Sequence, residues 1–205
     1  MPTRERYEAL WRALPEGLEP SDFVRRRRFL LEHVARAGSG PRVLDIGCGE
    51  GAFAAAMLDA GAHVVAVDIA EEPLRRARSR RPELDLRLVA PDGPWPLDDA
   101  SFDAVWAGEV IEHVADTAAW LSEVRRVLRS GGSLVVSTPA HGRLALMRLA
   151  FSPRAFAEHF DPLGDHLRFY DRRTLARLLD EFGFEHVTVR SAGGLLLAHA
   201  IRSRF

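Results

Sequence analysis

The sequence contains no lysine, only one cysteine and no long uninterrupted run of apolar residues. All 28 basic residues are therefore arginine, and with 29 acidic residues the formal net charge is −1. A near-neutral balance provides no overall positive field, so a nucleic-acid partner is not expected. The lone Cys48 excludes an intrachain disulfide framework and a metal site built from several cysteines. Without about 20 consecutive apolar residues, no stable membrane insertion is expected.

The residues that are present suit one soluble globular domain. The chain has 205 residues, of which 47% are hydrophobic and 28% are charged, and this is enough to bury a substantial core. Residues 1–12 carry too many charges for a secretory signal, so a cytoplasmic location is expected. Composition leaves the oligomeric state open.

The central motif is V-L-D-I-G-C-G-E-G at residues 43–51. A short apolar run of strand type leads into a glycine-rich turn, and an alanine-rich helical stretch follows. This order is typical of sites that bind a nucleotide-like ligand at a helix N-terminus. The spacing is neither the G-x-G-x-x-G of dinucleotide binding nor a P-loop with G-K-[ST]. A plain strand-to-helix turn is the alternative.

From residue 42 onward, short apolar segments alternate with helical ones. Alternation of this kind predicts right-handed crossovers and a parallel sheet covered on both faces, with ligands bound at the carboxyl ends of the strands. The expected strands are residues 42–46, 63–67, 86–90, 102–107, 133–137, 185–189 and 195–201. The expected helices are residues 50–60, 71–78, 116–129 and 174–182.

Two more helices are expected before the first strand. The apolar face of the first is formed by Tyr7, Leu10, Trp11 and Leu14, which recur at helical spacing. Ser21 is placed to cap the second helix, which carries the arginine run at residues 25–28. These arginines form a solvated face, or one of them reaches the carboxylate of a ligand seated on the glycine turn.

Polar residues follow three further strand ends. Asp68 lies about 20 positions after the glycine turn, where an acidic residue accepts hydrogen bonds from ribose hydroxyls or caps the next helix. Pro91, Asp92 and Gly93 follow the third strand. The fourth strand leads into residues 108–113, which end in E-V-I-E-H.

The spacing of Glu109, Glu112 and His113 is i, i+3 and i+4. On a helical turn this places all three side chains on one face. Two carboxylates and an imidazole suit a divalent cation such as Mg²⁺, Mn²⁺ or Zn²⁺. The alternatives are that His113 acts as a base or orients a reacting group, or that it has a purely structural role.

Taken together, these motifs resemble those of the class I S-adenosylmethionine-dependent methyltransferases, in family order over about residues 20–190. The matching segments are residues 43–51, Asp68, residues 91–103, residues 124–132, residues 166–170 and residues 181–184. The resemblance implies an α/β, Rossmann-like, doubly wound, mostly parallel seven-stranded sheet with a C-terminal antiparallel hairpin. It implies one domain over residues 1–205: N-terminal helices (1–40), a cofactor-binding core (41–138), a cap or lid insertion (139–169) and a C-terminal helix with the hairpin (170–205).

The resemblance also implies how S-adenosyl-L-methionine is bound. Asp45 would orient the methionine end of the cofactor, and the backbone of Gly47, Cys48 and Gly49 would hold it. Asp68 would bind the ribose and Ile69 would pack on the adenine. Asp92 would accept a hydrogen bond from the adenine amino group, and the backbone of Gly93 would donate one to the adenine. Pro91 replaces the glycine usual in the family and offers no N–H.

The E-x-x-E-H motif resembles the metal-binding motif of the ubiquinone-pathway O-methyltransferases and of the small-RNA 2′-O-methyltransferases. That resemblance implies Mg²⁺ or another divalent metal held by Glu109, Glu112, His113 and His166. Many small-molecule methyltransferases carry a Leu-Glu-His sequence at this place without a metal. The candidates for catalysis are therefore His113, Glu109 and His166.

Residues 139–165 are expected to form an irregular connection after the fifth strand. Their apolar and arginine-bearing sequence favours a cap over a pocket for an apolar or aromatic acceptor, and a helix packed on the core is the alternative. His141 and His159 are expected to be surface residues.

The expected function is methyl transfer from S-adenosylmethionine to a small-molecule acceptor, on an oxygen nucleophile. The alternatives are a metal-dependent RNA 2′-O-methyltransferase, which would need a local basic groove, and a non-catalytic domain that binds the cofactor. The sequence leaves open which acceptor is used and whether oxygen, nitrogen or carbon is methylated.

Overall fold

A seven-stranded sheet with the strand order β3-β2-β1-β4-β5-β7-β6 forms the centre of the computed structural model, which describes residues 4–91, 93–161 and 164–204. The strands from β3 to β5 pair in parallel, whereas β7 pairs antiparallel with β5 and with β6. This confirms the predicted doubly wound sheet with its closing hairpin. The strands are β1 (Arg42–Ile46), β2 (His63–Asp68), β3 (Asp85–Leu88), β4 (Phe102–Gly108), β5 (Leu128–Pro139), β6 (Phe184–Ala192) and β7 (Leu195–Arg202).

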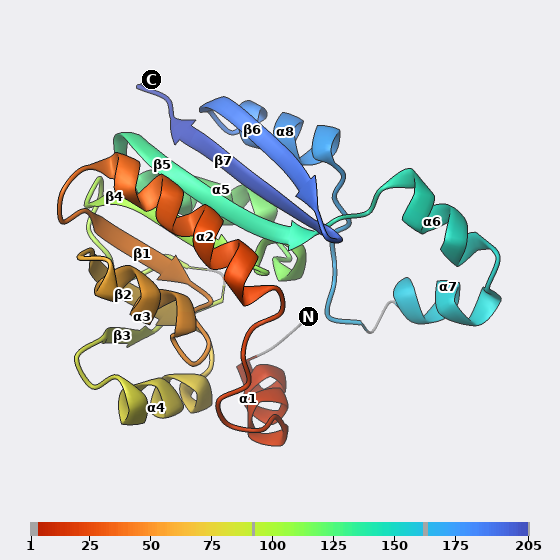
Figure 1. Ribbon diagram of the computed structural model, residues 1–205, viewed down its shortest axis with the longest axis horizontal. Coiled ribbons are helices and arrows are strands. Elements are labelled where there is room, and N and C mark those ends of the chain that lie inside the picture. The colour runs from red at the N-terminus through yellow and green to blue at the C-terminus, as the bar shows by residue number, and fades with distance from the viewer. Residues whose placement is uncertain (1–3, 92, 162–163, 205) are drawn as a thin grey trace.

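Helices cover both faces of the sheet, as Figure 1 shows. One face carries α2 (Phe23–Val34), α3 (Ala52–Asp59) and α4 (Glu71–Arg80), and the other carries α5 (Thr117–Val127) and α8 (Arg172–Glu181). Successive side chains of a strand point to opposite faces. Accordingly, Val43 packs in the core that contains Phe29 of α2, and Leu44 packs in the core that contains Leu121 of α5. Both faces of β1 are therefore buried.

Several expected boundaries differ from the structure. β5 starts at Leu128 and not at residue 133, because Leu128 already pairs with Phe102 of β4, before a register shift to the pair Ala104 and Ser133. α2 starts at Phe23 after Asp22, which has a φ of 49°. The predicted cap at Ser21 is therefore wrong, and its carbonyl oxygen instead accepts a hydrogen bond from Nη1 of Arg26 at 3.2 Å.

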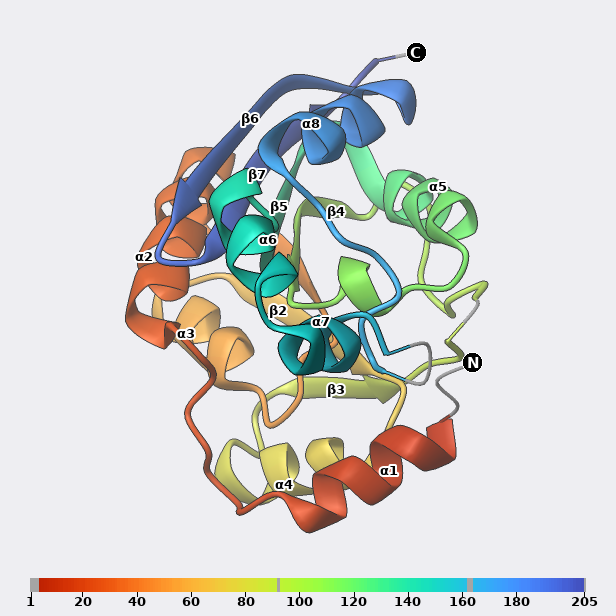
Figure 2. The same cartoon turned by 90° about the vertical axis from the view of Figure 1, so that its right-hand side faces the viewer.

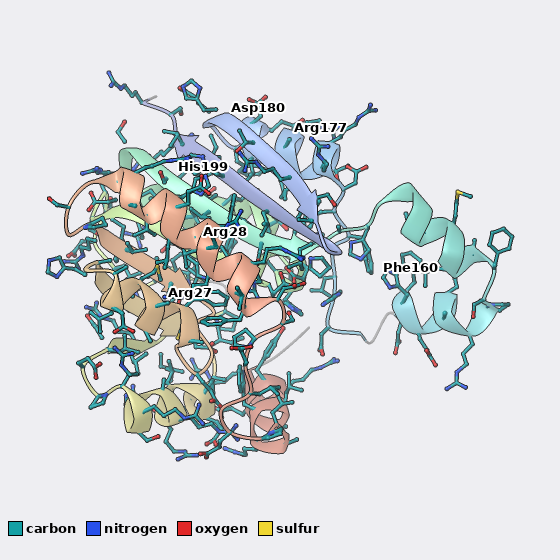
Figure 3. The ribbon with its side chains drawn as sticks, viewed as in Figure 1. Arg27, Arg28, Phe160, Arg177, Asp180 and His199 are labelled. Atoms are coloured by element: carbon teal, nitrogen blue, oxygen red, sulfur yellow. The ribbon has the colours of Figure 1, made fainter. Side chains whose placement is uncertain are left out.

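Residues 139–165 are not the irregular connection that was predicted. They contain two short helices, α6 (Arg143–Ala150) and α7 (Pro153–His159), and the Ser152 side chain caps α7 by accepting from the Ala155 amide. The two helices project from the side of the molecule in Figure 1, and Phe160 lies at the end of α7 in Figure 3. His141 is buried against the rings of His159 and Phe169, so its predicted surface position is wrong.

The first helix, α1 (Arg4–Ala13), lies beside α4 and at a distance from the sheet, which both views show (Figures 1 and 2). A 3₁₀ turn, η1 (Ala35–Ala37), connects α2 toward β1, and a second one, η2 (Ile111–His113), follows β4. None of the helices in the described ranges is both long and apolar enough to cross a membrane.

Candidate functional site

A cavity of about 680 Å³ opens at the carboxyl ends of β1, β2 and β4. The order of the strands reverses at β1, which lies between β2 and β4, so the cavity occupies the position where doubly wound sheets bind their ligands. Six of the predicted site residues line it: Gly47, Asp68, Ile69, Gly93, Glu109 and His113. Asp92, which was predicted to meet the adenine amino group, lies outside the described residues.

The glycine turn is shaped by positive φ angles and by hydrogen bonds to β2. Gly47 has a φ of 66°, and a Cβ atom there would stand 2.6 Å from Cγ2 of Val110. The amides of Gly47 and Cys48 donate to the carbonyl oxygen of Val67 at 2.9 and 3.0 Å. The Gly49 amide donates to Oδ2 of Asp68 at 2.9 Å. These amides build the turn itself, so a ligand would meet the open surface of Gly47.

Asp68 joins the glycine turn to the next helix. Its second oxygen, Oδ1, accepts from the Ala70 amide at 3.0 Å, next to the start of α4. Burial raises the pKa of Asp68, and the amide hydrogen bonds counteract this shift. A carboxylate has about four lone-pair sites. Asp68 can therefore hold the turn and start the helix while it still accepts hydrogen bonds from ribose hydroxyls in the cavity that it lines.

Asp45 is a buried carboxyl group that lacks a full set of partners. Its side chain is 1% exposed, and Oδ2 has no hydrogen-bond partner among the described residues. Burial, followed by the nearby charge of Asp68, raises the pKa of Asp45 to about 8. A buried carboxylate needs a cation or hydrogen-bond donors. The ammonium group of an amino-acid ligand on the glycine turn would supply both, and in this respect the site fits S-adenosylmethionine.

Arg26 is the only buried arginine of the run at residues 25–28, and Figure 3 labels Arg27 and Arg28 on the same helix. Its Nε donates to Oγ of Ser137 at 3.0 Å, and its guanidinium lies 4.7 Å from the ring centre of Phe53. Ser137 in turn donates to Oε1 of Glu109 at 3.0 Å. Burial lowers the pKa of Arg26, and Glu109 opposes this shift. Arg26 is not among the residues that line the cavity, so the contact between an arginine of this run and a ligand carboxylate stays a prediction.

The E-x-x-E-H segment does not form one helical face as predicted. Only Ile111–His113 is helical, and Glu109 precedes it with a φ of 58°. The Glu112 side chain turns inward and is fully buried, where Oε2 accepts from Oγ1 of Thr138 at 2.9 Å and Oε1 has no partner among the described residues. Burial and then the charge of Glu109 raise the pKa of Glu112 to about 8.

His113 is held with one ring nitrogen toward the site. Its Nδ1 lies 2.9 Å from the carbonyl oxygen of Asp165, so Nδ1 carries the hydrogen and Nε2 carries the lone pair when the ring is neutral. The pKa of His113 is lowered, mainly because the ring is buried. Nε2 lies 3.9 Å from Oε1 of Glu112.

His166 comes to the same place from a distant part of the chain. The carbonyl oxygen of Glu112 accepts from the amides of Leu167 and Arg168, and the rings of His166 and His113 are 4.9 Å apart. Ligand atoms of Glu112, His113 and His166 lie within 4.8 Å of one another, whereas Glu109 is not part of this group. Three of the four predicted metal ligands are thus brought together.

The sequence reasoning missed one whole wall of the cavity. Helix α1 contributes Arg4, Tyr7, Leu10 and Trp11 to the lining, and Leu14 lines it just beyond the helix. Other parts of the lining include Trp95, Trp120 and Asp165. The helical spacing of the α1 residues was the available signal. No described residue of α6 or α7 lines the cavity, so the predicted cap role of residues 139–169 stays a prediction.

Comparison with known proteins identifies the family of this chain. A family model described as a methyltransferase domain matches residues 21–189. A probable S-adenosylmethionine-dependent methyltransferase of Mycolicibacterium smegmatis is 36% identical over 175 residues, which are 85% of this chain and 63% of that protein. A ubiquinone biosynthesis O-methyltransferase of Xylella fastidiosa is 38% identical over 132 residues, which are 62% of this chain and 53% of that protein. This chain therefore spans only about half to two thirds of these two relatives.

Among solved structures, a chain of the complex between the Haloferax volcanii Trm112 methyltransferase activator and a putative methyltransferase is similar over its whole length. The TM-score is 0.75 at 19% identity, and the match covers 99% of this chain and 98% of that one. Similarity at this level of identity supports the fold alone.

Proposed function

This chain belongs to the class I S-adenosylmethionine-dependent methyltransferases, and we propose that it transfers a methyl group to an oxygen atom of a small-molecule acceptor. One observation carries the proposal: both Asp68 and His113 line a single cavity. A donor held at Asp68 and an acceptor held at His113 would share that cavity. The relative named as an O-methyltransferase supports oxygen as the nucleophile.

The residues around the glycine turn would bind the cofactor, which supplies an activated methyl group on a positively charged sulfur atom. Asp68 would accept from the ribose hydroxyls, and Ile69 and Gly93 would lie against the adenine. Asp45 would pair with the ammonium group through Oδ2, the oxygen that has no partner among the described residues. The methionine part would contact the exposed backbone of Gly47, which lines the cavity.

His113 would act as the base. Nε2 would take the proton of the acceptor hydroxyl as the oxygen forms its bond to the methyl carbon and the bond from that carbon to sulfur breaks. The carbonyl oxygen of Asp165, 2.9 Å from Nδ1, would orient the ring and stabilise the imidazolium that forms. Alignment of the acceptor with the methyl group contributes the larger part of the rate in such reactions.

A metal-dependent reaction is the second candidate, and the group of Glu112, His113 and His166 favours it. A divalent cation there would occupy Nε2 of His113, so this histidine would act as a ligand and not as the base. The carboxyl group of Glu112, whose pKa is raised to about 8, would release its proton to solvent when its carboxylate binds the cation. Heat from Mn²⁺ titrated into chelator-treated protein, and lost in Glu112→Gln, would support this candidate.

Incubation with methyl-labelled S-adenosylmethionine and a panel of phenols, matching anilines and a short single-stranded RNA tests the nucleophile. We expect label in the phenols without added metal, and its loss in His113→Asn. Label in the anilines would contradict oxygen as the nucleophile. Label in the RNA that requires Mn²⁺ would favour the metal-dependent RNA methyltransferase.

A further inference from the structure

We infer that helix α1 is a wall of the cofactor site and that Tyr7 is a further cofactor-binding residue, which none of the family motifs identifies. This inference rests on the proposed function, because it assumes that S-adenosylmethionine occupies the cavity. The apolar residues at helical spacing in α1 belong neither to the glycine turn nor to the strand ends, and the inference gives them a role.

The inner face of α1 covers a cavity and not a packed core. Three side chains of the helix, those of Tyr7, Glu8 and Trp11, are partly buried, as is that of Leu14 just beyond it, and no residue of the helix is fully buried. The residues that recur at helical spacing, Tyr7, Leu10, Trp11 and Leu14, nevertheless all line the cavity. An amphipathic helix gains stability when its apolar face is covered. A ligand in the cavity would provide that cover.

The two ends of α1 contact two different segments of the expected cofactor site. At its first turn, Arg4 donates to the carbonyl oxygens of Ile69 and Val89 at 2.9 and 3.1 Å, beside the expected adenine position. Near its last turn, the Trp11 indole lies 3.0 Å from the place where Gly49 would carry a Cβ atom. The helix therefore runs from the adenine end of the site to the glycine turn.

Tyr7 lies between these two ends with a buried hydroxyl group. The oxygen has no hydrogen-bond partner among the described residues, and the ring centre lies 6.2 Å from that of His113. Burial, and then the charge of Asp165, raise the pKa of Tyr7 to about 12, and Asp68 contributes in the same direction. The hydroxyl group therefore keeps its proton. A buried hydroxyl without a partner is rare in proteins, and a ligand between Asp68 and His113 would supply one.

Glu8 ties α1 to the start of α4. Its carboxylate accepts from the amides of Glu71 and Glu72 at 2.5 and 3.2 Å. The N-cap residue of α4, Ala70, has no side chain that could do this. A carboxylate at a helix N-terminus satisfies free amides and interacts favourably with the helix dipole. Since α4 begins three residues after Asp68, this contact attaches α1 to the segment that would bind the ribose.

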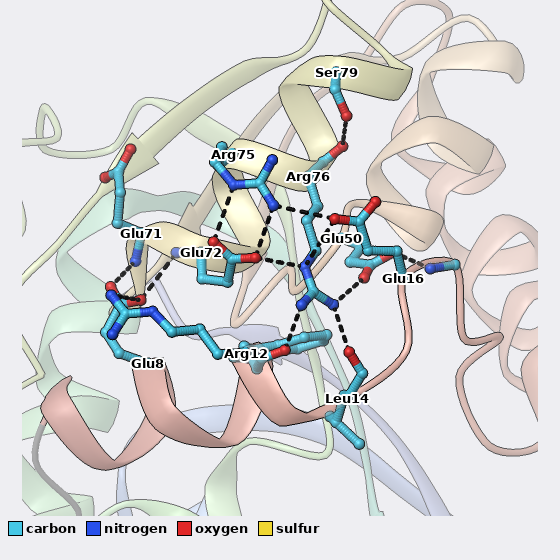
Figure 4. Close-up of polar contacts among 12 residues, drawn as sticks. Glu8, Arg12, Leu14, Glu16, Glu50, Glu71, Glu72, Arg75, Arg76 and Ser79 are labelled. Atoms are coloured by element: carbon cyan, nitrogen blue, oxygen red, sulfur yellow. Dashed lines mark hydrogen bonds and ion pairs between the residues drawn. The ribbon is translucent and has the colours of Figure 1, made fainter.

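Arg76 ties the other end of α1 to the glycine turn, as Figure 4 shows. Its guanidinium is buried and donates to the carbonyl oxygens of Trp11 and Leu14 at 2.6 and 3.0 Å. It also donates to Glu50, the residue after Gly49, at 3.1 Å. The glycine turn and the segment after Asp68, which would bind the cofactor, therefore also contact α1. Docking of α1 and binding of the cofactor should thus favour each other.

Titration of S-adenosylhomocysteine into the full chain, with hydrogen exchange followed in α1, tests the inference. Tyr7→Phe removes only the hydroxyl, and Glu8→Ala removes the contact with α4. We expect about tenfold weaker binding in each variant. Glu5→Ala removes an exposed carboxylate from the same helix and should bind as the unchanged protein does. The ligand should slow exchange of the α1 amides.

The outcomes separate the inference from the proposed function. If the unchanged protein does not bind S-adenosylhomocysteine, the proposed function fails. If it binds, and binding is the same in both variants without protection of α1, the inference alone is overturned. Unchanged binding in Tyr7→Phe with weaker binding in Glu8→Ala would overturn the role of Tyr7. Circular dichroism of each variant checks that it is folded.

Discussion

Three buried carboxyl groups surround the site, and each has a raised pKa. Asp45, Asp68 and Glu112 are at most 7% exposed, and Arg26 is the one fully buried arginine that counters Asp45 and Glu112. Charged groups are rarely buried unless they are paired. A cofactor with an ammonium group and a sulfonium would bring two positive charges to this place. This imbalance of buried charge favours a ligand that carries positive charge.

This imbalance predicts that Asp45→Asn stabilises the ligand-free protein. The pKa of Asp45 is raised from 3.8 to about 8, so the folded state holds the proton more tightly than the unfolded state does. Stability from this group therefore falls as the pH rises from about 4 to about 8. Asparagine cannot ionise, so its advantage in Tm should grow over this range, by roughly 2–4 °C for each kcal/mol.

Thermal unfolding at several pH values between 5 and 8 measures this effect. The same variant should bind S-adenosylhomocysteine at least tenfold more weakly, because the partner of the ammonium group is lost. Asp59→Asn is a suitable control, since Asp59 is exposed and pairs with Arg81. A Tm difference between Asp45→Asn and the unchanged protein that is the same at every pH would refute this role of burial.

A second prediction at the residue scale concerns His113. Burial lowers its pKa below the ordinary value of 6.5, so the ring is neutral at pH 7 and able to take a proton. Transfer to a phenolic acceptor should be independent of pH above 7 and fall at lower pH as His113 becomes protonated. His113→Asn should lower kcat by about 10²–10⁴-fold. Its affinity for S-adenosylhomocysteine should change little, and a large loss of that affinity would assign His113 to cofactor binding.

At the scale of elements, the connections after the strands carry the site. The turn after β1, the end of β2 and the segment after β4 converge because parallel strands end at the same edge of a sheet. The sequence allowed this convergence to be predicted, since G-x-G-x-G, Asp68 and E-x-x-E-H each follow an apolar run.

Other elements could not be predicted so well, for identifiable reasons. The apolar spacing in α1 is the same whether the helix covers a core or a cavity, so the role of Tyr7 was missed. The turn at Glu109 was missed because a positive φ is uncommon for a residue other than glycine. In α7 a signal was present, because Ser152 followed by Pro153 is a common start of a helix.

The glycine turn supplies the prediction at this scale. In Gly47→Ala the new Cβ would meet Val110 at 2.6 Å, and the φ of 66° disfavours alanine. We expect a lower Tm and at least tenfold weaker binding of S-adenosylhomocysteine. Gly142→Ala is the matched control, because its φ is −73° and nothing lies within 4 Å of the added atom. Equal behaviour of the two variants in thermal unfolding and calorimetry would contradict this description of the turn.

For the whole molecule, a doubly wound sheet places one cavity at its switch point and encloses it with a helix from the N-terminal region. The family, the fold and the cofactor class follow from motifs that lie within residues 20–190. The domain limits, with a cap at residues 139–169, stay predictions. Met147 in α6, Phe151 just after α6 and Phe156 in α7 are exposed. Apolar periodicity alone could not tell a projecting pair of helices from a cap.

Calorimetric titration of S-adenosylhomocysteine into the full chain, in parallel with Asp68→Ala, tests the central claim most directly. We predict binding to the unchanged protein without added metal, and binding at least tenfold weaker in Asp68→Ala. Asp59→Ala should bind as the unchanged protein does. If S-adenosylhomocysteine does not bind with or without Mg²⁺, the cavity is not a cofactor site and the glycine turn has only a structural role.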